Sequence, residues 1–136
     1  RIDIVQAPLN LVDQRLITSG WLSRLHSEEI EIHTRSVFLQ GLLLMPRNSI
    51  PNIFNRWSRV WDQWTLELER NKLSAVGACL LYPLSFPEIN RVIVGVDNST
   101  QLNSIINSSK SHQSKIDWSF MSCNDEMLIN PTNWYN

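Results

Sequence analysis

The sequence has few cysteines and no long apolar run. Cys79 and Cys123 are its only two cysteines, and no CxxC motif or Cys/His cluster surrounds them, which argues against a disulfide framework and a zinc site. No apolar stretch approaches the roughly 20 residues that span a bilayer, and the first residues lack the basic and then apolar character of a secretory signal. We therefore expect a cytoplasmic protein that does not act at a membrane.

The sequence also lacks an excess of charge of either sign. Its formal net charge is −1 and its pI is about 6.3, so it has no basic field for nucleic-acid phosphates, and nucleic acid is not an expected partner. With 43% hydrophobic and 18% charged residues among 136, the chain has the composition of one ordinary folded domain.

Motifs of hydrolases and metalloenzymes are missing as well. His26, His33 and His112 are scattered, and none belongs to an HExxH motif or accompanies a GxSxG motif. Neither hydrolysis nor metal-dependent chemistry is therefore expected. The sequence begins with Arg1 rather than Met, directly in a strand-like segment, which leads us to expect a fragment of a longer protein.

What is present is a strand followed by a helix, three times in succession. β-branched runs predict strands at 2–7, 30–33 and 91–95. Apolar residues at helical spacing predict helices at 14–25, 53–68, 74–83 and 100–106, with Ser74 as an N-cap. Repeated strand–helix units predict parallel strands with right-handed crossovers, and so an α/β fold.

Four segments carry a family resemblance, and together they span nearly the whole chain. They are DIVQAPLN at 3–10, RSVFLQGLL at 35–43, VIVGVDNSTQL at 92–102 and LINPTNW at 128–134. In this order they resemble the sixth, seventh and eighth strands and the closing segment of the aldo/keto reductases. The segment RSVFLQG at 35–41 also resembles reductases of surface-polysaccharide and sugar-nucleotide pathways.

The resemblance implies a fold, a reaction and a partner. The fold would be the C-terminal part of a (β/α)₈ TIM barrel, about strands 6–8 with their helices, with βα units in 1–107 and a tail segment in 108–136. The reaction would be reduction of a small-molecule carbonyl compound, sugar-related if the narrower likeness holds, by hydride transfer from NADP. Closing a barrel takes about eight strands and roughly 250 residues, so the missing N-terminal half would be the partner.

The resemblance also implies a cofactor site on the loops that follow the strands. Gln6 would hold the nicotinamide amide, Arg35 would replace an aromatic residue that stacks on the nicotinamide ring, and Ser36 would donate to a phosphate. Backbone N–H groups of the adjoining loop would approach the diphosphate, and the turn after the third strand would bind the adenosine end. These two loops contribute Phe38, Gln40, Gly41, Gly95, Val96, Asp97, Asn98 and Gln101.

The sequence departs from the family where the cofactor's 2′-phosphate would bind. Members that prefer NADP place Lys or Arg in this turn and at the helix start, whereas this sequence has Gly95 and Gln101. NADP remains the cofactor that the resemblance implies, and NAD stays an alternative, with Asp97 able to accept from ribose hydroxyls.

The family's catalytic Tyr, Lys, Asp and His would lie upstream of this chain. No residue here takes a catalytic role, including Tyr82 and Tyr135, and we expect the chain alone to be inactive. A non-catalytic binding or partner module is the alternative function. Each of two site residues has an alternative role that needs no cofactor. Gln6 could be a buried residue whose side chain bonds the neighbouring backbone, and Arg35 could belong to a surface ion pair.

Six tryptophans invite a carbohydrate-binding interpretation. Trp57, Trp61 and Trp64 recur at helical spacing, which is more typical of a core or interface stripe than of a ligand platform. Trp118 and Trp134 lie near the C-terminus, where the family's closing loop borders the substrate, and they are the better candidates for substrate contact.

Overall fold

The computed structural model describes residues 2–110 and 116–135 of the chain. Its helices and strands, in chain order, are β1 (Ile4–Pro8), α1 (Arg15–Thr18), α2 (Trp21–Ser27), β2 (Glu31–Arg35), α3 (Ser58–Asn71), α4 (Ala75–Leu84), β3 (Arg91–Val92), α5 (Ser99–Ser109) and α6 (Glu126–Ile129). Short 3₁₀ turns η1 to η5 occupy Leu42–Leu44, Arg47–Ser49, Asn52–Trp57, Ser119–Met121 and Pro131–Asn133.

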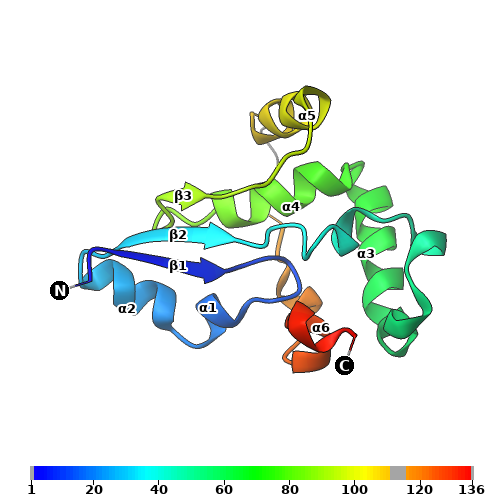
Figure 1. Cartoon of the computed structure of the whole chain (residues 1–136), viewed down its shortest axis with the longest axis horizontal. Helices are drawn as coiled ribbons and strands as arrows, with labels where there is room; N and C mark the ends of the chain where they lie inside the picture. Colours follow the sequence, from blue (N-terminus) through cyan, green and yellow to red (C-terminus); the bar gives the residue numbers. More distant parts are fainter. Residues whose placement is uncertain (1, 111–115, 136) are drawn as a thin grey trace.

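The three strands form one sheet in the order β1-β2-β3, and both neighbouring pairs are parallel (Figure 1). Gln6 lies opposite His33, and His33 lies opposite Arg91. The predicted α/β class and the parallel direction of the strands are therefore confirmed. Because the strands are parallel, the loops that follow them leave from the same edge of the sheet.

The predicted barrel segment is wrong for this chain. The described residues form an open three-stranded parallel sheet, and they do not close into a barrel. The physical reason is that three strands cannot curve back to pair with each other, since closure takes about eight. One face of the sheet, which includes Ile4 at 52% exposed, stays open to solvent.

Some predicted elements change at their ends. The single helix expected at 14–25 is divided into α1 and α2 at Gly20, whose φ of 80° is left-handed. Only Arg91 and Val92 of the strand expected at 91–95 join the sheet. Helix α5 continues to Ser109, so the predicted division between 1–107 and 108–136 falls within its last turn. His112 and the other residues at 111–115 of the predicted tail segment lie outside the described residues.

The core lies between the covered face of the sheet and its helices. Ile32 and Thr34 of β2 are fully buried on the covered face, where α2 packs against β2 and α4 packs against β3. Trp61 and Trp64 of α3 are also buried, and their indole N–H groups donate to the carbonyls of Phe54 and Leu43. The tryptophan stripe is therefore part of the core, as its spacing predicts.

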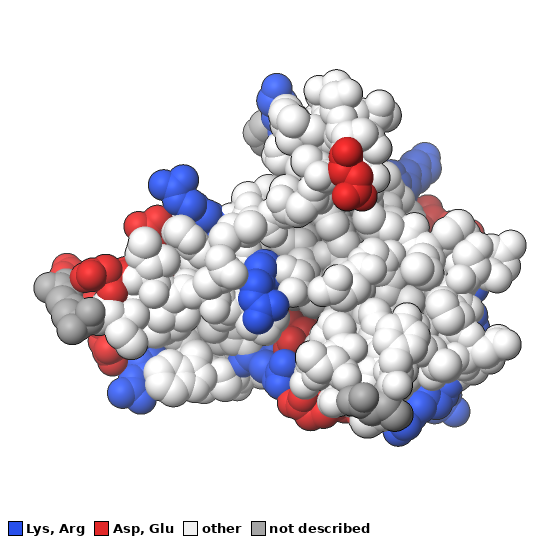
Figure 2. Space-filling model, viewed as in Figure 1, with Lys and Arg blue, Asp and Glu red and all other residues white. Residues whose placement is uncertain are grey.

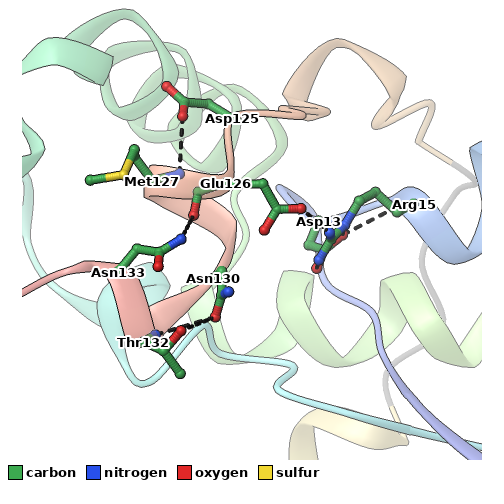
Figure 3. Close-up of polar contacts among 8 residues, drawn as sticks. All are labelled: Asp13, Arg15, Asp125, Glu126, Met127, Asn130, Thr132 and Asn133. Carbon is green, nitrogen blue, oxygen red and sulfur yellow. Dashed lines mark hydrogen bonds and ion pairs between the residues drawn. The ribbon is translucent and has the colours of Figure 1, made fainter. Parts of the chain in front are cut away.

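The C-terminal segment packs against this core and against the loop after β1. Arg15, at the start of α1, binds Asp13 of the loop before it at 2.9 Å and Glu126 of α6 at 2.5 Å (Figure 3). The buried side chain of Gln14 donates to the carbonyl of Trp118. Residues more than a hundred positions apart are thereby held together.

Helix length and hydropathy bear on any membrane role. In the described part of the chain, no helix combines the length and the apolar character required to cross a bilayer.

Tyr82 on α4 yields a prediction about alkaline stability. Burial, with a smaller contribution from the charge of Asp117, raises its pKa from 10.0 to about 12. The folded state therefore binds the phenol proton more tightly than the unfolded state, so this stabilisation is complete below pH 10 and is lost as the pH rises toward 12. Tyr82→Phe should show a shallower loss of unfolding free energy over this range, measured by urea denaturation.

Tyr135→Phe is the matched control, because Tyr135 is 85% exposed. Burial also raises the pKa of the Cys79 thiol, so some alkaline loss should remain in both variants. An unchanged pH dependence in Tyr82→Phe would contradict the prediction.

Candidate functional site

A cleft of about 790 Å³ opens where the loops that follow β2 and β3 meet α5. Nine of the eleven predicted cofactor residues line it: Arg35, Ser36, Phe38, Gln40, Gly41, Gly95, Val96, Asp97 and Gln101. The other two, Gln6 and Asn98, do not. Figure 2 shows that the surface between α5 and the rest of the body is largely uncharged.

The loop after β2 has an unusual backbone. Ser36, Leu39, Gln40 and Gly41 have φ values of 61°, 46°, 55° and 84°, all left-handed. Such residues are rare outside glycine, and clusters of them are typical of ligand-binding loops because their strain must be held by the surrounding structure. The left-handed turns leave the backbone N–H groups of the loop without their usual helical partners.

Several of these N–H groups are available to a ligand. Leu39, Leu42 and Leu43 donate within the loop. By contrast, the N–H groups of Phe38, Gln40 and Gly41 donate to no other group in residues 2–110 and 116–135, and all three residues line the cleft. Adjacent free N–H groups of this kind form a concave site for anions such as phosphate.

Asn10 holds this loop to the loop after β1. Its side chain is 1% exposed. The amide oxygen accepts from the N–H groups of Val12 (3.0 Å) and Asp13 (2.8 Å), and the amide nitrogen donates to the carbonyl of Ser36 at 3.0 Å. One buried amide therefore fixes the start of the left-handed loop.

On the opposite side of the cleft, the turn before α5 is organised by its own side chains. Asn98, which is not among the lining residues, caps the helix by accepting from the N–H of Gln101 at 2.9 Å. The side-chain oxygen of Gln101 in turn accepts from the N–H of Asp97 at 2.8 Å. Asp97 is exposed at the cleft, with its carboxylate unpaired within the described part of the chain.

The cleft carries only two charged side chains among its lining residues, Arg35 and Asp97. Arg35 donates to the hydroxyl of Ser36 at 3.0 Å. It joins no ion pair within residues 2–110 and 116–135, so the alternative explanation of Arg35 as an ion-pairing residue finds no support there. Its guanidinium is free to bind an anion at the same end of the cleft as the free N–H groups.

Gln6 lies outside the cleft, contrary to its predicted position at the strand end. It is exposed in the middle of β1, because the strand continues to Pro8. Its neighbour His33 bonds Glu31 at 2.7 Å, and this bond, aided by Arg91, lowers the pKa of Glu31. Pro8 pairs with Arg35, so Gln6 lies two residues before the rim that bears the cleft.

The predicted substrate tryptophans do not reach the cleft. Trp118 is 6% exposed and packs on Trp64, with ring centroids 5.7 Å apart. Trp134 packs edge-on against Phe54 at 4.8 Å. Both positions are explained by docking of the C-terminal segment.

The sequence reasoning missed part of the lining. Ser104 and Ile105 of α5 also line the cleft, together with Val76 of α4. Helical periodicity offered a signal for the first two, because residues three and four positions after Gln101 share its helix face. No local pattern pointed to Val76, which reaches the cleft through helix packing.

A second, smaller pocket of about 220 Å³ lies beside the first and shares Arg35 and Ser36 with it. Asp13, Arg15 and Glu126 form part of its wall, and Arg15 already binds both carboxylates. Their charges are therefore used in docking the C-terminal segment.

No protein-family model and no curated protein matches this chain. The resemblance to reductases therefore rests on the four sequence segments quoted above.

The role of Asn10 can be tested by truncation. Asn10→Ala removes acceptors for two buried N–H groups and a donor to the Ser36 carbonyl, and it should lower the free energy of unfolding by about 2 kcal/mol. Asn55→Ala is the control, because the Asn55 amide bonds only an exposed side chain. Urea denaturation of both variants measures the difference, and equal small losses would contradict this role.

The strained loop gives a matched pair of glycine substitutions. Gly41→Ala should lower the free energy of unfolding by about 1 kcal/mol, because alanine at a left-handed φ is strained even though a methyl group there would meet nothing within 4 Å. Gly95 has equally open surroundings and no left-handed φ, so Gly95→Ala should change stability by less than about 0.5 kcal/mol. Similar urea midpoints for the two variants would rule out backbone strain at Gly41.

Proposed function

We propose that the cleft binds the diphosphate and adenosine of a nicotinamide dinucleotide, in a protein that reduces a small carbonyl compound by hydride transfer. The observation that carries this proposal is the left-handed loop at 36–41, in which residues with free N–H groups line the cleft together with Arg35. A diphosphate has the charge and the oxygen acceptors that such a loop can bind.

The residues present fit this cofactor. Arg35 can pair with one phosphate, and the Ser36 hydroxyl can donate to it. The apolar lining residues Val76, Ile93 and Ile105 can cover an adenine ring. The volume of the cleft, about 790 Å³, lies within the range of small-molecule sites.

The nicotinamide would extend from this cleft over the open face of the sheet. Gln6 precedes the rim residue Pro8 by two positions on that face, which is about 7 Å along a strand. Its carboxamide can accept and donate to the amide of the ring. The bound dinucleotide supplies the hydride, while these residues bind and orient it.

A second candidate, dinucleotide binding without catalysis by this chain, is favoured by the chemistry of the lining. No Tyr, Lys, His or Cys lines the cleft in the described part of the chain. Tyr, Lys, His and Cys are therefore missing as general acids, and Asp97 is the only titratable acid among the described lining residues. If this chain acts alone, binding is the activity it retains.

The proposed setting is the cytoplasm. Cys79 and Cys123 are both free thiols, as is usual in that compartment.

Binding can be measured by titrating the chain with NADH and with NADPH and following the fluorescence of the reduced nicotinamide. Arg35→Gln should weaken binding of the preferred dinucleotide about tenfold, through loss of a charge-assisted bond to phosphate. Arg24→Gln is the matched control, because Arg24 is exposed on α2, where it pairs with Glu28 and lies over the Trp21 ring, and it does not line the cleft.

Loss of affinity in Arg35→Gln alone supports the proposed site. Failure of the unaltered chain to bind either dinucleotide, or equal affinity of all three proteins, would overturn it. Consumption of NADH or NADPH with an aldehyde substrate would separate the two candidates, because turnover by the chain alone contradicts binding without catalysis.

A further inference from the structure

We infer that the α5 end of the cleft accepts an unphosphorylated ribose, so that the cleft selects NADH over NADPH through Asp97. This inference rests on the proposed function. It concerns which of two nearly identical ligands the same cleft prefers.

The two charged side chains of the lining come from different loops and differ in sign. Arg35 ends β2 and lies beside the loop with free N–H groups, whereas Asp97 lies in the turn that leads into α5. When the diphosphate of a dinucleotide binds beside Arg35, the ribose of its adenosine lies at the turn before α5. The group that distinguishes the two cofactors, the 2′-phosphate, then meets a carboxylate.

Among the described residues of the cleft lining, no cation at this end compensates for that carboxylate. Helix α5, Ser99–Ser109, contains no Lys or Arg, and Arg35 is the only cation in the cleft lining among the described residues. The helix dipole supplies about half a positive charge at the start of α5. The full negative charge of Asp97 outweighs it, so a phosphate is disfavoured there.

The neighbouring amide cannot take over the role of a cation. The side-chain oxygen of Gln101 is held by the N–H of Asp97 at 2.8 Å, which fixes the side chain beside the carboxylate. Its remaining N–H donors are neutral. They can bond a ribose hydroxyl, but they do not offset the charge of a phosphate.

A carboxylate is well suited to the unphosphorylated sugar. Asp97 is acceptor-only when ionised, and its oxygens can receive both hydroxyl protons of a ribose diol. Replacement of one hydroxyl by a phosphate removes one donor and adds like charge. Selectivity therefore follows from a gained repulsion as well as from a lost hydrogen bond.

The test compares NADH and NADPH dissociation constants for the chain and for Asp97→Asn, which keeps the size of the side chain and removes its charge. The unaltered chain should bind NADH at least about fivefold more tightly than NADPH, and Asp97→Asn should reduce this preference about fivefold, mainly by tightening NADPH. Asp62→Asn is the control for net charge, because Asp62 on α3 pairs with Arg47 and does not line the cleft.

The outcomes separate this inference from the function beneath it. Binding of NADPH as tightly as NADH by the unaltered chain would overturn the inference and leave the dinucleotide site intact. A preference for NADH that persists unchanged in Asp97→Asn would overturn the role of Asp97. Binding of neither dinucleotide would overturn both proposals, and circular dichroism of each variant shows whether it is folded as the unaltered chain is.

Discussion

The buried amide of Asn10 is the interaction on which the cleft depends. It bonds two N–H groups of its own loop and the carbonyl of Ser36, twenty-six residues away. Ser36 is the first left-handed residue after β2, so this bond sets the direction in which the chain leaves the sheet. An amide can do this because it both accepts and donates, whereas a carboxylate at the same position would place an acceptor against the Ser36 carbonyl.

The strain of the following loop is offset by burial next to it. Three non-glycine residues with left-handed φ cost on the order of 1–2 kcal/mol each. Leu39, Leu42 and Leu43 from the same segment are at most 2% exposed, and full burial of such a side chain contributes roughly 1.5–3 kcal/mol. The apolar residues therefore hold the backbone in a conformation that keeps its polar groups at the cleft.

The sequence was informative where structure follows from local pattern. Strand and helix periodicity predicted the parallel order, and Ser74 caps α4 as expected, accepting from the N–H of Gly77. Nine of the eleven predicted residues line one cleft, because parallel strands bring their loops to one edge.

The sequence predictions were wrong where the outcome depends on distant contacts. It placed Gln6 at a strand end that lies two residues later, and it gave no hint that Trp118 is buried against Trp64. The predicted barrel also failed, since closure depends on strands that these residues do not supply.

The described part of the chain brings groups suited to phosphate binding to the cleft, but not the tyrosines that could transfer a proton. Groups suited to phosphate, the free N–H groups of Phe38, Gln40 and Gly41 with Arg35, gather where the backbone is most constrained. Tyrosines, which are suited to proton transfer, do not gather there, because neither Tyr82 nor Tyr135 lines the cleft. Tyr82 is buried beside Phe86, with ring centroids 5.3 Å apart, and Tyr135 lies exposed in the C-terminal segment. A proton donor would have to come from another segment placed over the open face of the sheet, next to Gln6. The cleft proposed for the cofactor and the open face proposed for the reacting group can therefore lie on one surface, and the cleft can form without a covered face.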